Sequence, residues 1–296
     1  MDCAKVTRNI RTGLKSYIIG NDIKSLVIGV SGGADSAACC ALARAVCDEL
    51  GVPLIGRSIP IETNKPDEIK RALIVGEAFC HDFKEVDLTG LYHVTKSTFE
   101  DAMLDTDIDK IAQGNIKARL RMQLLYATAG MSRGMVLSTD NLTEYYLGFF
   151  TLCGDVGDFG MVQFAWKTEV YHLMEYLHSI ERIKKRQEGI LSCRIAIPTD
   201  GLGISSSDLD QIGAGSYDEV EVILKTWLTK DKDSFLWDEE LRWEEWSGFE
   251  KRPEKYADFV KFRETFKDHP VVLRYEKTHF KRNWPIGLSR QKLFSN

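Results

Sequence analysis

The chain of 296 residues contains 44% hydrophobic and 28% charged residues, and its formal net charge at pH 7 is −5. This composition is typical of a soluble globular protein, and the negative charge excludes a general attraction to nucleic acid or to an acidic membrane. No apolar run approaches the ~20 residues that cross a bilayer, the N-terminus lacks an apolar signal segment, and the seven cysteines contain no CxxC pair. We therefore expect a cytoplasmic protein with reduced thiols that binds neither nucleic acid nor a membrane.

Apolar runs alternate along the chain with segments that carry apolar residues at helical spacing. Strands are predicted at Ser25–Val30, Pro53–Pro60, Phe83–Leu88, Met135–Ser138 and Arg194–Ile197. Helices are predicted at Ala37–Leu50, Pro66–Cys80, Asn115–Ala129 and Thr168–Ile180. This alternation is typical of an α/β fold with a Rossmann-like parallel sheet and helices on both faces, in which ligands bind beyond the carboxyl ends of the strands.

A tight turn, SGGADS at residues 31–36, joins the first predicted strand to the helix that follows. Glycines let an anion approach the backbone, and the free N–H groups and the helix dipole favour negative charge there. Asp35 suits a phosphate only if a metal lies between them, which suggests Mg²⁺. The alternative is an ordinary strand-to-helix turn in which Ser36 caps the helix. The turn is neither a Walker A motif nor GxGxxG, and by itself it does not decide between the two.

Two polar residues follow the predicted strand Met135–Ser138. Thr139 can hydrogen-bond a nucleotide, and Glu144 could join Asp35 on one magnesium ion, because Mg²⁺ usually takes one or two protein carboxylates. The alternative for Glu144 is a capping role at a helix N-terminus.

The helix predicted at Asn115–Ala129 has a basic face formed by Lys117, Arg119 and Arg121. Arg119 would suit a phosphate or a carboxylate as a bidentate donor. The alternative is a solvated basic face that binds nothing. In the alanine-rich helix after the glycine turn, Cys39 and Cys40 are expected to be core residues.

The turn resembles the SGGxDS pyrophosphate loop of the N-type ATP pyrophosphatases, which hydrolyse ATP between the α- and β-phosphates. Within that superfamily, four further segments resemble NAD synthetase in order and approximate spacing. They are GNIKARLRMQLLY (114–126), STDNLTEYYLGFFTLCGDVGD (138–158), IPTDGLG (197–203) and KRNWP (281–285). The resemblance covers nearly the whole chain except residues 227–279.

The resemblance implies a single NAD synthetase domain over residues 1–296 with the adenine nucleotide alpha hydrolase-like fold. It implies an ammonia-dependent ligase that uses ATP and Mg²⁺ to amidate deamido-NAD through an adenylated intermediate, giving NAD, AMP and pyrophosphate. It also implies a homodimer. Because the synthetase pattern and an insert occupy the 296 residues, a glutaminase domain is not expected.

The resemblance also implies roles for individual residues. The expected catalytic residues are Asp35 and Lys167, and the expected metal ligands are Asp35 and Glu144. The expected ATP-binding residues are Ser31, Gly32, Gly33, Asp35, Ser36, Arg57, Thr139, Lys167 and Thr199. The expected deamido-NAD-binding residues are Tyr17, Arg119, Tyr126, Asp155, Asp158, Lys281 and Arg282.

Three residues depart from the family pattern at substrate or lid positions. Leu152 and Leu209 stand where a lysine and a glutamate are usual, and Phe280 stands where a histidine is usual. Two alternatives therefore stay open. One is another N-type ATP pyrophosphatase that amidates or thiolates a purine or a tRNA, and the other is a non-catalytic nucleotide-binding relative.

Residues 227–279 form a stretch dense in charge and tryptophan. We predict a helical insert that covers the mouth of the active site and is packed by its aromatic side chains. Those side chains include Trp237, Trp243, Trp246 and Phe249.

Overall fold

The computed structural model describes residues 1–62, 64–102, 108–199, 207–229 and 256–282. The chain divides into two compact units. Unit 1 comprises Met1–Leu142 and Phe150–Gln211, and unit 2 comprises Thr143–Phe149 and Ile212–Asn296. In the described part of the chain, no helix is both long enough and apolar enough to cross a membrane.

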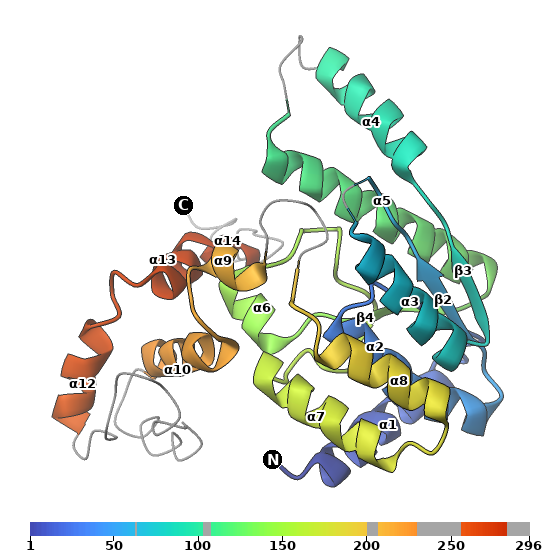
Figure 1. Cartoon of the computed structure of the whole chain (residues 1–296), viewed down its shortest axis with the longest axis horizontal. Coiled ribbons are helices and arrows are strands. Elements are labelled where there is room, and N and C mark those ends of the chain that lie inside the picture. The colour runs from blue at the N-terminus through green and yellow to red at the C-terminus, as the bar shows by residue number, and fades with distance from the viewer. Residues whose placement is uncertain (63, 103–107, 200–206, 230–255, 283–296) are drawn as a thin grey trace, which may run out of the picture. The chain divides into compact units, whose positions relative to one another are not determined.

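Unit 1 is built on a five-stranded parallel sheet with the order β3-β2-β1-β4-β5 (Figure 1). The strands are β1 Leu26–Gly29, β2 Leu54–Ser58, β3 Asp82–Glu85, β4 Met135–Ser138 and β5 Phe159–Gly160. In register, Leu26 of β1 lies opposite Leu54 of β2 and Met135 of β4. The predicted α/β class and parallel sheet are confirmed.

The predicted strand at Arg194–Ile197 is wrong. Arg194 is the last residue of a helix, and the helical hydrogen bonding continues one residue further, because the N–H of Ile195 donates to the carbonyl of Leu191 at 3.1 Å. The side chains of Ile195 and Ile197 are 70% and 72% exposed, so this apolar run does not enter the sheet. The fifth strand is β5, whose two residues are too few to produce a sequence pattern.

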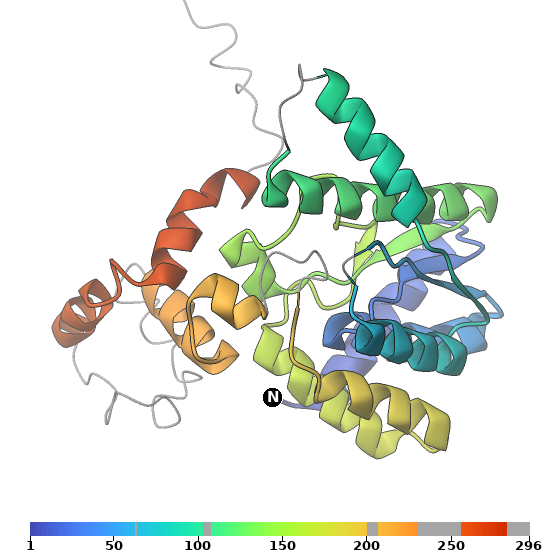
Figure 2. The same ribbon diagram turned by 45° about the horizontal axis from the view of Figure 1, so that its top comes forward.

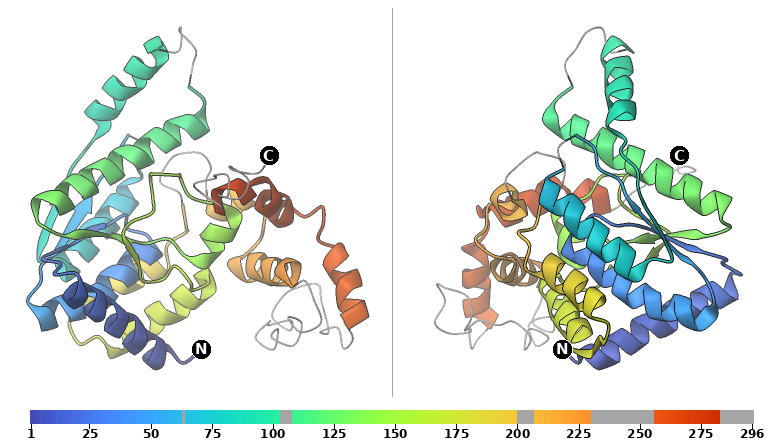
Figure 3. Two further views of the ribbon diagram at one scale, coloured as in Figure 1. Left: turned by 180° about the vertical axis from the view of Figure 1, so that it is seen from behind. Right: turned by 45° about the vertical axis from the view of Figure 1, so that its right-hand side comes forward.

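The helices of unit 1 are α1 Cys3–Gly20, α2 Ala34–Leu50, α3 Pro66–Phe79, α4 Thr89–Ala102, α5 Lys110–Met131, α7 Lys167–Ile180 and α8 Lys184–Arg194. They cover both faces of the sheet (Figures 2 and 3). The alternation of side chains along β1 shows the two layers. Leu26 and Ile28 pack in the large core with α2, whereas Val27 packs on the opposite face with Met122 and Leu125 of α5.

Helix α2 begins at Ala34, earlier than the predicted start at Ala37, and Gly33 is its N-cap residue. The interpretation of Ser36 as a helix cap is therefore wrong, because Ser36 lies inside the first turn. Cys39 and Cys40 are fully buried, which confirms that they are core residues.

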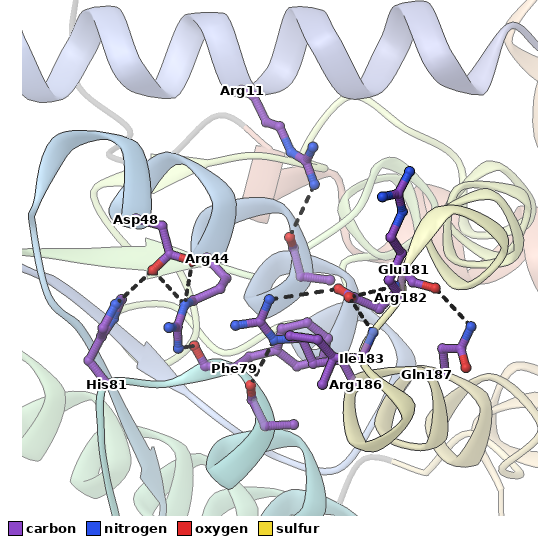
Figure 4. Close-up of polar contacts among 12 residues, drawn as sticks. Arg11, Arg44, Asp48, Phe79, His81, Glu181, Arg182, Ile183, Arg186 and Gln187 are labelled. Carbon is purple, nitrogen blue, oxygen red and sulfur yellow. Dashed lines mark hydrogen bonds and ion pairs between the residues drawn. The ribbon is translucent and has the colours of Figure 1, made fainter.

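The C-terminus of α3 is held by arginines from two other helices (Figure 4). Arg44 of α2 donates to the carbonyl of Phe79 at 3.0 Å, and Arg186 of α8 donates to the carbonyl of Ala78 at 3.1 Å. Arg44 is itself paired with Asp48 at 2.8 Å. Carbonyls in the last turn of a helix have no partner within the helix, so these arginines supply the missing donors.

Unit 2 is helical in its described part. Its elements are α6 Leu142–Leu147 from Thr143 onward, α10 Tyr217–Leu228, α12 Tyr256–Glu264, α13 Pro270–Lys277 and α14 His279–Arg282, and α9 Asp208–Ile212 connects to it from unit 1. The predicted insert at residues 227–279 therefore contains α12 and α13 where it is described. Trp237, Trp243, Trp246 and Phe249 lie outside the described residues, and the role of the insert as a cover stays a prediction.

Candidate active site

The glycine turn joins the end of β1 to α2 and is folded around two serine hydroxyls. The oxygens of Ser31 and Ser36 lie 3.0 Å apart, and Ser36 donates to the carbonyl of Gly33 at 3.1 Å. Gly32 has a φ of +79°, and a Cβ there would lie 2.2 Å from the backbone oxygen of Glu68, so only glycine fits. The N-cap Gly33 supplies no side-chain hydrogen bond to the first turn of α2. The helix dipole and the uncapped first-turn N–H groups suit this end of α2 to a phosphate.

The two predicted catalytic residues are in contact in unit 1. Asp35, in the first turn of α2, forms an ion pair with Lys167, the first residue of α7. The other carboxylate oxygen of Asp35 accepts a hydrogen bond from the side-chain amide of Asn141 at 3.0 Å. Lys167 is 3% exposed, so its charge is compensated within the protein. The fold therefore brings together segments that lie far apart in the sequence.

A further carboxylate, that of the half-buried Asp140, lies close to this pair. Burial raises the pKa of Asp140 to about 7, the nearby charges of Asp155 and Asp35 act in the same direction, and the hydrogen bond from Ser138 acts against them. The hydroxyl of Ser138 donates to Asp140 at 2.7 Å. The raised pKa means that ionisation of Asp140 is opposed by its like-charged neighbours, so a cation bound beside Asp35 would favour the ionised form of Asp140.

The remaining residues predicted to bind ATP lie at three places in unit 1. Thr139 directly follows β4. Arg57 is on β2, and its guanidinium is paired with Asp82 of β3 at 2.9 Å. Thr199 follows α8 in sequence, and its hydroxyl donates to Glu68 of α3 at 2.6 Å.

Three of the residues predicted to bind deamido-NAD gather around the start of β5. The hydroxyl of Tyr126 donates to Asp158 at 2.9 Å, and the second oxygen of Asp158 accepts from the backbone N–H of Val136 at 2.8 Å. The ring of Tyr17 lies next to that of Phe159, with 5.1 Å between the centroids. Desolvation and the hydrogen bond to Asp158 raise the pKa of Tyr126 to about 12 even though the residue is 42% exposed, so its hydroxyl stays a donor.

The three basic side chains of α5 lie in different surroundings. Arg119 is exposed, and its Nε donates to the carbonyl of Leu152 at 3.2 Å. Lys117 is 2% exposed and is paired with Glu62 at 3.4 Å, so the alternative of a solvated basic face is wrong for this residue. It is also wrong for Arg121, which donates to the carbonyl of Ile59 at 3.0 Å.

The loop that carries Asp155 lies against the same helix. The backbone N–H of Thr151 donates to the carboxylate of Asp155, and the hydroxyl of Thr151 donates to Asn115 of α5 at 2.7 Å. The hydrogen bond that Leu152 accepts from Arg119 and the one that joins Thr151 to Asp155 therefore lie in the same short segment, residues 151–155. This segment contains Leu152, one of the three departures from the family pattern.

The other predicted residues, Glu144, Lys281 and Arg282, belong to unit 2. Glu144 is in the first turn of α6. The last carbonyls of α6 and its C-cap accept hydrogen bonds from basic side chains: Arg282 to Tyr146 at 2.7 Å, Arg274 to Leu147 at 3.2 Å, and Lys281 to Gly148 at 2.8 Å. Lys281 and Arg282 thus supply hydrogen-bond donors to the C-terminus of α6, the helix that carries Glu144.

Sequence reasoning missed the residues that orient the predicted ones. Asn141 lies in the same segment as Thr139 and Glu144, but its hydrogen bond to Asp35, 106 positions away, follows only from the folded structure. Glu68 lies in an ordinary helix start, NKPDE, and its sequence gives no sign of a bond to Thr199, 131 positions away.

The donor set around Asp35 fits a magnesium ion that is also bound by phosphate. Among the described residues, no group of three or more His, Cys, Asp or Glu side chains is arranged to hold a metal by itself. Mg²⁺ does not need one, because it usually takes one or two carboxylates together with phosphate and water. Asp35, in the first turn of α2 and close to the half-buried Asp140, could supply one such carboxylate.

Comparison with known proteins identifies the relatives of the chain. The family model described as NAD synthase matches residues 6–245. The chain is 32% identical over 209 residues to the NH(3)-dependent NAD(+) synthetase of Methanococcoides burtonii, covering 70% of this chain and 73% of the relative. It is 30% identical over 235 residues to the enzyme of the same name from Finegoldia magna, covering 79% and 89%.

Solved structures share the fold. The NMN synthetase from Francisella tularensis is 22% identical and superposes with a TM-score of 0.70 over 98% of both chains. The NH3-dependent NAD synthetase from Campylobacter jejuni is 19% identical, with a TM-score of 0.66 over 98% of this chain and 100% of that one.

Proposed function

Because the chain belongs to the NAD synthase family, we propose that it catalyses the ATP-dependent amidation of deamido-NAD by ammonia, forming NAD, AMP and pyrophosphate. The observation that carries this proposal is the contact of Asp35 with Lys167 at the N-terminus of α2, next to the glycine turn. The chain that contains this contact matches the family over residues 6–245. Activity on a purine or a tRNA, and a purely binding function, are not favoured by these relatives.

The first step is activation of the nicotinate carboxylate, which is a poor electrophile. A carboxylate oxygen attacks the α-phosphorus of ATP and pyrophosphate leaves, so that a mixed acyl-phosphate anhydride forms. Negative charge builds up on the departing pyrophosphate, and donors directed at it stabilise the transition state. We propose that the N–H groups of the glycine turn and of the first turn of α2 act as such donors, and the lack of a side-chain cap at Gly33 supports this.

Lys167 supplies a fixed positive charge beside the turn. Its ammonium group forms an ion pair with Asp35, and we propose that it contacts the phosphates of bound ATP. Magnesium, when bound, would neutralise phosphate charge and polarise the reacting phosphoryl group. Asp35 would hold it, and the share of Glu144 in unit 2 remains a prediction.

The second step is attack of ammonia on the acyl carbon, after which AMP leaves and the amide remains. No side-chain nucleophile is needed, because the adenylate is the activated group.

We propose that deamido-NAD is bound by Tyr126, Asp158 and Tyr17 together with Arg119 and Asp155. The grouping of the first three around β5 supports this. The roles of Lys281 and Arg282 in deamido-NAD binding, the single synthetase domain, the homodimer and the cytoplasmic location also remain predictions.

The test is a product assay with purified protein, ATP, Mg²⁺ and an ammonium salt. With deamido-NAD we expect equal amounts of NAD, AMP and pyrophosphate. One parallel reaction replaces ammonium by glutamine, and another replaces deamido-NAD by nicotinate mononucleotide, since one structure with this fold is named an NMN synthetase. Release of AMP only with the mononucleotide would change the substrate in this proposal, and absence of AMP with every acceptor would refute it.

A further inference from the structure

A chain of hydrogen bonds in unit 1 converges on Glu68, in the first turn of α3. Glu68 is 6% exposed, and both of its carboxylate oxygens are occupied. Oε1 accepts from the hydroxyl of Thr199 at 2.6 Å. Oε2 accepts from the side-chain amide of Asn64 and from the backbone N–H of Lys65, each at 3.2 Å. One buried carboxylate therefore joins the loop before α3 to the segment after α8.

The loop before α3 is in turn held by α5. Arg121 donates to the carbonyl of Ile59 at 3.0 Å and to Oδ1 of Asn64 at 2.8 Å, and the backbone N–H of Ile61 donates to the same oxygen at 3.0 Å. Because Oδ1 accepts from two donors, the amide nitrogen of Asn64 must be the atom that faces Glu68. The direction of every hydrogen bond in this chain is thus fixed.

The backbone of Glu68 lies against the glycine turn. Its carbonyl oxygen occupies the space that a side chain at Gly32 would need, and one helical turn further on Arg71 donates to the carbonyl of Gly32 at 2.9 Å. Glu68 thus contacts the phosphate end of the site through its backbone and Thr199 through its side chain.

The direction of the Thr199 bond limits what this threonine can bind. A carboxylate only accepts hydrogen bonds, so the single hydroxyl proton of Thr199 is directed at Glu68. The hydroxyl can then offer only its lone pairs to a ligand. Phosphate oxygens at neutral pH also offer lone pairs, so they do not match it. The ribose hydroxyls and the exocyclic amine of adenine carry protons, and they do match it.

We propose that Glu68 is a positioning residue that fixes Thr199 as a hydrogen-bond acceptor, so that Thr199 recognises a donor group on the nucleoside part of ATP and not its phosphates. This rests on the proposed role of Thr199 in ATP binding. The simpler interpretation is that Glu68 only caps α3. Capping accounts for the bond from Lys65 to Oε2, but it does not account for Oε1 and Thr199.

The first experiment measures dissociation constants, which do not depend on turnover. Wild type and Thr199→Val are titrated with Mg²⁺ and four nucleotides: ATP, 2′-deoxy-ATP, 3′-deoxy-ATP and purine riboside triphosphate, which lacks the amine. In the wild type we expect one analogue to bind about 3- to 10-fold more weakly than ATP, as loss of one hydrogen bond predicts. In Thr199→Val that analogue and ATP should bind equally. If Thr199→Val weakens all four nucleotides by the same factor, the contact is to phosphate and the proposal is wrong.

The second experiment reverses the direction of the hydrogen bond between the Thr199 hydroxyl and the side chain at position 68. In Glu68→Gln, the two donors Asn64 and Lys65 favour the amide oxygen on their side, which places the amide NH₂ against Thr199. Thr199 then accepts from the glutamine and turns its own proton toward the nucleotide. We expect weaker ATP binding and loss of the discrimination between ATP and the sensitive analogue, while the KM for deamido-NAD stays within about 2-fold.

The matched control is Glu77→Gln on the same helix, whose carboxylate is paired with Lys185 at the surface and should leave all four constants unchanged. If Glu68→Gln is folded by thermal melting and still discriminates like the wild type, Glu68 is only a cap. If Glu68→Gln does not fold, Thr199→Val alone decides. A wild type that binds ATP but makes no NAD would refute the proposed function and leave this inference to be judged by the binding constants.

Discussion

At the scale of single residues, the candidate site contains a charged pair whose side chains are largely shielded from solvent. Asp35 and Lys167 come from the starts of two different helices, and the lysine is 3% exposed. A buried pair of this kind contributes little net stability, but loss of one partner is costly because it leaves the other charge in a poor environment. Stability and activity should therefore respond differently to changes at these two positions.

We predict that Asp35→Ala abolishes AMP release and also lowers the free energy of unfolding by about 3–5 kcal/mol, because a buried ion pair with Lys167 is broken. The double variant Asp35→Ala/Lys167→Met should recover most of that stability in a urea titration and remain inactive. Wild-type stability in Asp35→Ala would show that the pair is not buried as described. AMP release by the double variant would show that neither Asp35 nor Lys167 is required for the reaction.

Asp140 predicts a pH dependence. Its pKa in the folded protein is about 7, above the ordinary value of 3.8, so between these values the folded state binds more protons than the unfolded state. The contribution of Asp140 to stability is therefore fully present below pH 4 and is lost as the pH rises through 7, by about 4 kcal/mol in total. In metal-free protein, Asp140→Asn should remove this loss. The free energy of unfolding of the variant should therefore rise relative to that of the wild type as the pH increases. Parallel stability curves for the two proteins between pH 5 and 8 would contradict the assignment.

At the scale of elements, helix ends are held by side chains from other segments. Arg44 and Arg186 donate to the last carbonyls of α3, and Arg274, Lys281 and Arg282 do the same for α6 and its C-cap. In both cases basic side chains from helices remote in the sequence donate to carbonyls that would otherwise lack donors.

We predict that Arg186→Ala lowers the free energy of unfolding by about 1–3 kcal/mol, because the carbonyl of Ala78 loses its donor and the ring of Phe79 loses its packed guanidinium. Lys185→Ala is the control. Lys185 is the neighbouring residue, and its pair with Glu77 is about half exposed, so removing it should cost about 0–1 kcal/mol. Equal effects of the two substitutions in chemical denaturation would show that the contacts to α3 are not specific.

The sequence predicts elements that have long patterns and misses those that depend on distant partners. β1, β2 and β4 follow from apolar runs, and α5 follows from helical spacing, whereas Arg194–Ile197 has an apolar run that the fold leaves exposed. The residues of the turn and Lys167 can be found by motif. Asn141 and Glu68 cannot, because each acts through one hydrogen bond to a residue more than 100 positions away.

At the scale of the whole molecule, the predicted site residues are divided between the two units. Unit 1 holds the glycine turn, Asp35, Lys167 and Thr199, together with the tyrosines near β5. Unit 2 holds Glu144, Lys281 and Arg282, and it contains the described part of the predicted insert. The contacts described within unit 1 therefore support the ATP-binding part of the site most directly.

In the proposed reaction, ATP activates the nicotinate carboxylate by adenylation before ammonia attacks. The most direct test uses deamido-NAD with ¹⁸O in both carboxylate oxygens, together with ATP, Mg²⁺ and ammonium, followed by mass spectrometry of the products. The carboxylate oxygen that attacks the α-phosphorus must leave with AMP, so we predict one ¹⁸O in AMP, one in the amide of NAD and none in pyrophosphate. Label in pyrophosphate or in inorganic phosphate, or formation of NAD with unlabelled AMP, would contradict the account.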